Sequence, residues 1–312
     1  MKSTKVIFMG TPEFAVPVLQ TLIDNTEVVL VVTQPDKLVG RNKVLTPPPV
    51  KQLALENNIE VFQPTKIRED YERITSLNAD LIITCAYGQI ISEDILNIPR
   101  LGCFNLHGSL LPKYRGGAPI HYALLNGDKT TGITLMYMDE GMDSGDMIYK
   151  EEILIDDKDN IETLSNKLSD LASTMIIKYL PELINKTNPR EKQDECLVTF
   201  APIIKREDEH LDFHNSAECI INKFRALSPT PLPNFYLNGI EYKVAECMIV
   251  PAVGKESTIV EVNKDNIVIM AKDKGIKITK IKPTGKNIMN VRDFLNGCHE
   301  SLIGSEVKWW GK

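Results

Sequence analysis

Hydrophobic residues in the first half of the chain alternate between short continuous runs and helical spacing. Apolar runs that are typical of strands buried on both faces stand at 6–9, 28–32, 61–62, 80–84, 103–106, 134–138 and 147–149. Between them, apolar residues at helical spacing predict helices over 14–23, 47–57 and 120–126. Strands that alternate with helices predict an α/β fold, with a Rossmann-like, doubly wound and mostly parallel sheet.

A long amphipathic helix is expected next. Apolar residues recur every three or four positions from Ile161 to Tyr179, which predicts one helix with an apolar stripe. Glu162 stands three residues after Asp159, in the manner of a capping box. Pro181 is expected to kink or end the helix, because it lacks a backbone N–H and its ring crowds the preceding turn.

The pattern changes near residue 190. The polar stretch 186–195 has no periodicity and predicts a linker. A helix at about 216–227 follows, and after it come short strand patterns at 235–237, 240–244, 258–262, 267–271 and 276–281. Such spacing predicts a small antiparallel, OB-like β-barrel. We therefore expect a Rossmann-like domain at 1–189, a linker at 190–205 and a barrel domain at 206–312.

Composition narrows the class of protein. Hydrophobic residues make up 43% and charged residues 25% of the chain, as in ordinary globular proteins. No apolar run approaches the roughly 18 residues that a membrane span needs, and the run at 6–9 is too short for a signal peptide. We therefore expect a cytoplasmic protein with no membrane partner. The six cysteines are widely spaced, without a Cys-x-x-Cys pair, and are interpreted as small buried hydrophobes rather than disulfides or metal ligands.

The charge balance bears on nucleic-acid binding. The net charge of −6 argues against general affinity for nucleic acid. Between Lys264 and Lys286, however, seven lysines stand against two aspartates. This basic segment is either the solvated face of an antiparallel sheet or a surface that binds phosphates.

Candidate catalytic residues follow the predicted strands, since ligands of such sheets bind beyond the strand ends. Gly10 follows the first strand, but there is no Gly-x-Gly-x-x-Gly, so a nicotinamide cofactor is not expected. Asn105 and His107 end another strand, and residues i and i+2 of a strand project to the same side. Asp143 follows the neighbouring strand.

These three residues would supply the parts of acyl transfer to an amine. The Asn105 amide can stabilise an oxyanion, and the His107 imidazole can move a proton near neutral pH. The Asp143 carboxylate can orient or charge the imidazole. The alternative is a histidine that is satisfied inside a loop, with Asp143 capping a turn.

Two other patterns carry weaker signals. Ser109 could belong to a Ser-His-Asp hydrolase, but it lacks the Gly-x-Ser-x-Gly elbow that exposes such a nucleophile. His210 and His214 have the i, i+4 spacing of zinc ligands, without the glutamate that metalloproteases place after the first histidine. No metal site is expected.

Residues 105–112, NLHGSLLP, resemble the signature of the folate-dependent formyltransferases, and further matching residues follow at 115–120, 132–134 and 139–145. By this resemblance Asn105, His107 and Asp143 match the family's catalytic trio. The cosubstrate would be 10-formyltetrahydrofolate, with no metal. Its binding loops would include Ser109, Leu110, Leu111, Pro112, Tyr87, Gly88, Gln89, Ile90, Asp139 and Glu140.

Members of this family act on glycinamide ribonucleotide, on amino sugars attached to nucleotides, or on methionyl-tRNA. The segment 33–43, closed by 47–51, is similar to the tRNA-contacting insertion of the last branch. Its Lys37, Arg41 and Lys43 would bind phosphates; otherwise it is a solvated loop. The start of the chain at 10–15 and the presence of a C-terminal module also match this branch, whereas Gly117 stands where many relatives carry alanine.

The resemblance implies an enzyme that formylates the α-amine of initiator methionyl-tRNA for translation initiation and that acts as a monomer. The tRNA would contact both domains, with phosphates held by the basic segment. Two alternatives stay open. One is a formyltransferase that acts on an amino sugar nucleotide, and the other is a non-catalytic module that binds tRNA or folate.

Overall fold

The computed structural model describes residues 3–40, 42–298 and 301–308. It divides into two compact units. The first comprises Met1–Pro119, Thr130–Leu154 and Ser165–Pro202, and the second comprises Ile120–Lys129, Ile155–Leu164 and Ile203–Lys312. This division falls at 202/203, inside the linker expected at 190–205, and two short earlier stretches belong to the second unit. Each unit is described by itself.

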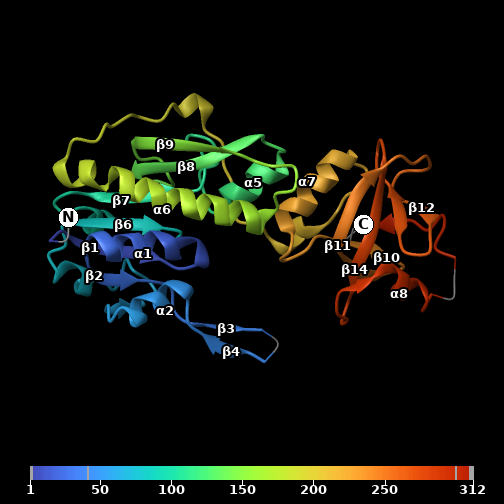
Figure 1. Ribbon diagram of the computed structural model, residues 1–312, viewed down its shortest axis with the longest axis horizontal. Coiled ribbons are helices and arrows are strands. Elements are labelled where there is room, and N and C mark those ends of the chain that lie inside the picture. Colours follow the sequence, from blue (N-terminus) through green and yellow to red (C-terminus); the bar gives the residue numbers. More distant parts are fainter. Residues whose placement is uncertain (1–2, 41, 299–300, 309–312) are drawn as a thin grey trace. The chain divides into compact units, whose positions relative to one another are not determined.

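The first unit is built on a seven-stranded sheet with the order β5-β2-β1-β6-β7-β8-β9 (Figure 1). Its strands are β1 (Lys5–Gly10), β2 (Glu27–Val32), β5 (Val61–Phe62), β6 (Leu81–Cys85), β7 (Cys103–His107), β8 (Thr130–Tyr137) and β9 (Met147–Leu154). Pairing is parallel from β5 through β7, while β8 and β9 are antiparallel to their neighbours. The predicted mostly parallel sheet is confirmed.

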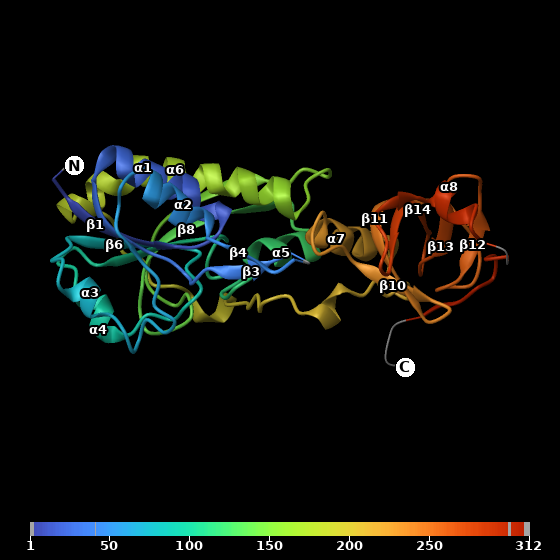
Figure 2. The ribbon, with the colours of Figure 1, turned by 90° about the horizontal axis from the view of Figure 1, so that it is seen from below.

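Helices cover both faces of this sheet. In Figure 2, α1 (Val16–Asn25) and α6 (Ile161–Asn185) lie on one side of the strands, and α3 (Glu72–Thr75) and α4 (Glu93–Leu96) lie on the other. Side chains alternate along β1, so Ile7 and Met9 enter the same apolar cluster as Ile74 of α3 and Ile95 of α4. Burial on both faces explains why these strands are continuous apolar runs.

The predicted long helix is present, but Pro181 does not end it and its capping pair differs from the expected one. α6 continues through Pro181 to Asn185. The proline removes the hydrogen bond to the carbonyl of Ile177, which stands on the exposed side of the helix where water can replace the bond. The capping pair is Asn160 and Thr163, which exchange backbone-to-side-chain hydrogen bonds of 3.0 Å. Asp159 instead accepts a bond from the backbone of Asp156.

The second unit contains α7 (Ala217–Leu227) and a curled antiparallel sheet, as predicted. The strands are β10 (Asn234–Leu237), β11 (Ile240–Val250), β12 (Ile259–Val262), β13 (Ile267–Met270), β14 (Gly275–Pro283), β15 (Met289–Asn290) and β16 (Val307–Lys308). β16 pairs with β10, and the adjoining backbone at 304–307 bonds to 257–259 beside β12. The two edges of the sheet are thereby linked around an apolar core. The remaining α-helices of the described ranges, in either unit, are α2 (Pro49–Glu56), α5 (Pro119–Leu125) and α8 (Val291–Leu295).

The segment that resembles a tRNA-contacting insertion contains a β-hairpin. β3 (Lys37–Val39) pairs with β4 (Val44–Thr46) as a separate two-stranded ribbon (Figure 1). Leu38 and Leu45 are each 62% exposed on it. Apolar side chains left open on a ribbon of this size are available to a partner.

The cysteines depart from their interpretation as buried hydrophobes. Cys85 and Cys103 are buried in the first sheet, whereas Cys196 and Cys219 are exposed, and all six cysteines are free. Burial raises the pKa of the Cys85 and Cys103 thiols to about 12. Within the described ranges, no group of residues could hold a metal ion and no helix is long and apolar enough to cross a membrane.

Thiol reactivity should follow this division. We expect the native protein at pH 8 to modify rapidly at Cys196 and Cys219 with a chromogenic disulfide reagent, because the thiolate is the reacting species. Cys85 and Cys103 should react only after unfolding. Mass spectrometry after brief labelling would identify the sites, and rapid native modification of Cys85 would contradict the buried β6 strand.

Candidate active site

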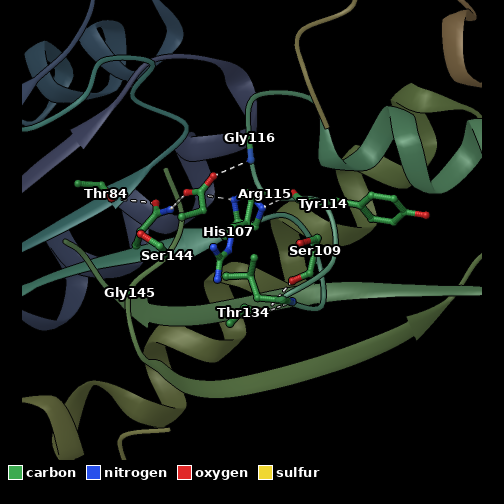
Figure 3. Close-up of polar contacts among 12 residues, drawn as sticks. Thr84, His107, Ser109, Tyr114, Arg115, Gly116, Thr134, Ser144 and Gly145 are labelled. Atoms are coloured by element: carbon green, nitrogen blue, oxygen red, sulfur yellow. Dashed lines mark hydrogen bonds and ion pairs between the residues drawn. The ribbon is translucent and has the colours of Figure 1, made fainter. Parts of the chain in front are cut away.

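The functional end of β7 carries two polar side chains that meet one carboxylate. Asn105 Nδ2 lies 3.5 Å from Asp143 Oδ1, and His107 Nδ1 lies 3.6 Å from the same oxygen. Figure 3 shows the polar contacts around His107, with Thr84, Tyr114 and Gly116 beside it. The side chains of Asn105 and His107 therefore project to one side of the strand, as its two-residue period predicts. An amide, an imidazole and a carboxylate thus converge in the first unit.

Asp143 reaches this place by a route that the sequence did not predict. The expectation was a neighbouring strand tip at the same edge of the sheet. β8 is antiparallel to β7, however, with Thr134 opposite His107 and Tyr137 opposite Phe104. The end of β8 therefore lies beside the start of β7, and the loop over 138–146 has to return along β7 to bring Asp143 to His107.

The Asp143 carboxylate is held firmly within this loop. Its Oδ2 accepts a hydrogen bond of 2.8 Å from Gly116 N, which leaves Oδ1 to face Asn105 and His107. The backbone of Asp143 has φ +51°, in the left-handed region where aspartate is among the better tolerated residues. Only 19% of its side chain is exposed, so the charge is partly shielded from water.

The ring of His107 has one nitrogen committed to the backbone. His107 Nε2 lies 2.9 Å from the carbonyl oxygen of Tyr114. A carbonyl can only accept, so Nε2 must carry a hydrogen. The neutral ring then presents the Nδ1 lone pair toward Asp143, and the protonated ring donates from Nδ1. The proton that can move is therefore the one on Nδ1.

Thr84, at the end of β6, orients the Asn105 amide and was missed by the sequence analysis. Its hydroxyl lies 2.8 Å from Asn105 Oδ1, nearer than its other acceptors Phe104 O and Met138 Sδ at 3.2 Å. Donation to Oδ1 points Nδ2 toward Asp143 and fixes the amide orientation. The available signal was a polar residue inside the otherwise apolar run 81–85.

In the loop 109–112, the serine has a structural role. Ser109 is fully buried and its hydroxyl donates to Lys113 O at 2.6 Å. Thr134 Oγ1 donates to Ser109 O and accepts from Leu111 N, which ties the loop to β8. This arrangement rejects the hydrolase alternative, because a nucleophile must be accessible and must face a base. Leu111 is buried, and Leu110 and Pro112 are half-buried.

The loop after β6 presents some of its predicted folate-binding residues and buries others. The ring of Tyr87 is buried in the core, which raises the pKa of its hydroxyl. The side chain of Gln89 accepts a bond from Ile67 N at 2.9 Å. Gly88 is exposed, as is Ile90 at 51%. The surfaces open to a cosubstrate are therefore Gly88 and Ile90.

The other predicted folate-binding pair lies in the loop after β8. The carboxylate of Asp139 accepts bonds from Ser144 Oγ at 2.9 and 3.0 Å and from Gly141 N at 3.1 Å. Glu140 is exposed. Asp139 therefore shapes the loop that carries Asp143, while Glu140 is free to face a ligand or solvent.

A polar stretch far along the chain also borders the site. Residues 191–201, here called the crossing segment, were predicted as part of a linker, yet they bond to the start of β9 and to the loop around Arg115 in the first unit. Glu191 exchanges backbone hydrogen bonds with Met147. Near its other end, Arg115 N donates to Thr199 O and Ala201 N donates to Arg115 O. No pattern in the sequence indicated this role, because the stretch has no periodicity.

Gly116 fills a position where any side chain would strain the structure. Its φ is +118°, and a Cβ there would lie 2.8 Å from Ala201 O in the crossing segment. Its N–H is the donor that holds Asp143. Close backbone approach and a left-handed φ are the two conditions that require glycine.

The lysines expected to bind phosphates are accessible. Lys37 and Lys43 are exposed on the hairpin, while Arg41 lies outside the described residues. In the second unit, six of the seven lysines of the basic segment are exposed and Lys277 is half-buried. Lys280 is paired with Glu246 at 2.7 Å, so part of this charge is compensated locally.

Comparison with protein families gives two matches. The formyl transferase family matches residues 4–180, and the formyl transferase C-terminal domain matches residues 203–299. The first match alone covers more than half of the chain, and it includes the trio and each predicted folate-binding residue.

Similar proteins match this chain over nearly their whole length. A methionyl-tRNA formyltransferase of Staphylococcus epidermidis is 46% identical over 305 residues, which cover 96% of this chain and 98% of the relative. One from Bacillus subtilis is 46% identical over 302 residues, with 95% of each chain covered.

Solved structures with this fold are more distant in sequence. A sugar 3N-formyl transferase, studied with dTDP and 5-N-formyl-THF, has a TM-score of 0.69 and 21% identity, and it covers 92% of this chain and 100% of its own. An N-formyltransferase from Helicobacter canadensis, in complex with folinic acid and dTDP-3-aminofucose, has a TM-score of 0.68 and 20% identity, with 88% and 98% covered. These likenesses support the fold.

Replacing Gly116 by alanine should destabilise the first unit. We expect Gly116→Ala to lower the free energy of unfolding by about 1–3 kcal/mol, because the side chain adds strain at a left-handed φ and contacts Ala201 O. Gly117→Ala is the matched control, since Gly117 is the exposed neighbour and has no left-handed φ. Equilibrium urea denaturation followed by circular dichroism would compare the three proteins, and equal loss in both variants would contradict the predicted clash.

Proposed function

The chain belongs to the formyl transferase family, and on this premise we propose that it formylates methionyl-tRNA. The formyl group comes from 10-formyltetrahydrofolate, and the product is N-formylmethionyl-tRNA for translation initiation. The observation that carries this function is high identity, along nearly the whole chain, to relatives named methionyl-tRNA formyltransferase. That identity extends over the hairpin and the second unit as well as the trio.

The site has groups suited to a formyl carbonyl and an attacking amine. Asn105 Nδ2 and protonated His107 Nδ1 are hydrogen-bond donors that face one point beside Asp143. Two such donors stabilise the oxyanion that develops when the amine adds to the formyl carbon. The residues present therefore fit the cosubstrate's reacting group.

Proton movement completes the reaction. The α-amine nitrogen forms a bond to the formyl carbon, the bond from that carbon to the folate nitrogen breaks, and one amine proton ends on that nitrogen. Asp143 pairs with His107 and helps to relay this proton. An α-amine with a pKa near 7.7–8.0 is partly unprotonated at neutral pH, so no strong base is needed.

The tRNA is held mainly through its phosphates. Positive charge is supplied by Lys37 and Lys43 of the hairpin, by Arg41 and by the exposed lysines of the basic segment, on a chain whose net charge is −6. Three loops bind the folate, and their residues either contact it or shape the loop. These residues are Ser109, Leu110, Leu111, Pro112, Tyr87, Gly88, Gln89, Ile90, Asp139 and Glu140. The enzyme acts as a monomer in the cytoplasm, where aminoacyl-tRNA is used.

One assay separates this function from its alternatives. The purified protein is mixed with 10-formyltetrahydrofolate and either methionyl-tRNA or an amino sugar nucleotide, and labelled formyl transfer is followed. Transfer to methionyl-tRNA is the expected result. Transfer to the sugar alone would favour the amino-sugar alternative, for which the basic segment has no use. Binding without transfer to either would favour a non-catalytic module.

Removal of the Asn105 amide should slow the chemical step. Asn105→Ala is expected to lower turnover by about 10² to 10³, the usual effect of losing an oxyanion donor. Asn185→Ala, an exposed position at the end of α6, is the control. Near-normal turnover of Asn105→Ala at saturating folate would disprove the role assigned to this amide.

Binding of tRNA should depend on salt. We expect the KM for methionyl-tRNA to rise with salt concentration, because bound phosphates release counterions when lysines replace them. Lys282→Gln, on the exposed side of β14, should reduce the slope of log KM against log salt by about one unit. Lys66→Gln, paired with Glu69 in the first unit, is the control. A KM that does not change with salt would contradict phosphate binding.

A further inference from the structure

Gln193 is a buried amide within an otherwise polar and exposed stretch. It belongs to the crossing segment and is 8% exposed, while its neighbours Lys192 and Asp194 are exposed. Its Nε2 donates to Asp143 O and to Gly145 O, each at 2.8 Å. Its Oε1 accepts from Arg115 Nε at 3.0 Å. Both N–H groups and the oxygen of the amide are therefore used, all on groups around the site.

These contacts act on the backbone that carries the reactive carboxylate. Asp143 stands at φ +51°, which an L-residue keeps only where neighbouring groups enforce it. Gln193 donates hydrogen bonds to the carbonyl oxygens of residues 143 and 145, so it fixes the backbone of the loop on both sides of Ser144. Gly145 is packed closely as well, since a Cβ there would lie 2.0 Å from Tyr137 O.

The same amide is anchored to the opposite loop through Arg115. This guanidinium is 5% exposed and also pairs with Glu195 of the crossing segment at 2.7 Å. The residues on either side of Arg115 serve the site directly. Tyr114 O fixes His107 Nε2, and Gly116 N fixes Asp143 Oδ2. Gln193 thus connects the loop that holds the imidazole to the loop that holds the carboxylate.

We propose that Gln193 is a positioning residue for formyl transfer, which sets the Asp143 carboxylate against His107 and Asn105. This inference rests on the proposed function. Gln193 acts through Asp143 and the backbone, so its effect falls on the chemical step rather than on substrate binding. Without its two donors the loop loses one of its holds, and a displacement of about 1 Å costs on the order of 10²-fold in rate.

Two substitutions distinguish the hydrogen-bond donors of the Gln193 amide from its acceptor. Gln193→Leu removes both donors and the acceptor. Gln193→Glu keeps an acceptor for Arg115 but sets a carboxylate against the carbonyls of Asp143 and Gly145. We expect both variants to lower kcat about 10- to 100-fold, with KM for folate and for methionyl-tRNA within about twofold. A fully active Gln193→Glu would overturn the proposal. If Gln193→Leu fails to fold, the kcat of Gln193→Glu alone tests the proposal.

A double-mutant cycle distinguishes positioning from a general structural role. In an Asp143→Asn background the carboxylate that Gln193 positions is absent. Gln193→Glu should then lower kcat by no more than about threefold further, so the two effects are strongly non-additive. A structural role would lower kcat by the same factor in both backgrounds, and that result would also overturn the proposal.

A control variant and the activity of the wild-type protein distinguish failure of this inference from failure of the proposed function. Lys192→Gln changes the exposed neighbour of Gln193 and should retain wild-type kcat and KM. Thermal unfolding of each variant checks that it is folded at the assay temperature. A wild-type protein that fails to formylate methionyl-tRNA would refute the proposed function, whereas an active wild type with unimpaired Gln193 variants would refute this inference alone.

Discussion

The site depends on one carboxylate that is held in place from several directions. Asp143 has a left-handed backbone, a carboxylate oxygen bonded to Gly116 N, and a carbonyl bonded to Gln193. These contacts leave Oδ1 toward the amide of Asn105 and the imidazole of His107. A partly buried charge needs such satisfied surroundings, and the same surroundings fix where it can act.

The sheet explains why so many contacts are required. Because β8 runs antiparallel to β7, the loop after it begins beside the start of β7 and must return to the functional end. This loop of nine residues, 138–146, has no strand pairing of its own that would hold its backbone in place. The close packing of Gly145 on Tyr137 and the bonds of the crossing segment supply that order. Catalytic geometry here comes from loops tied to a rigid sheet.

The two substrates place different demands on the chain. A formyl carbonyl needs only a few groups, but these must be accurately placed. Thr84 contributes to this placement, because its hydroxyl donates to Asn105 Oδ1 and orients the amide. A tRNA needs positive charge spread over accessible surfaces. The hairpin and the basic segment present exposed lysines that suit this part of the proposed function, while the whole chain stays at −6. Local basic surfaces on an acidic protein limit non-specific binding to nucleic acid.

The sequence by itself determined most of the buried strands, the long helices and the polar residues at the end of β7. Continuous apolar runs fixed the buried strands, and the two-residue period put Asn105 and His107 on one side. Tertiary structure alone decided the antiparallel direction of β8 and the partners of the trio. Thr84 lies 21 positions from Asn105, and Gln193 lies 50 from Asp143. Local patterns encode neighbours within a turn or a strand, whereas these contacts depend on which distant backbone groups the packed chain brings together.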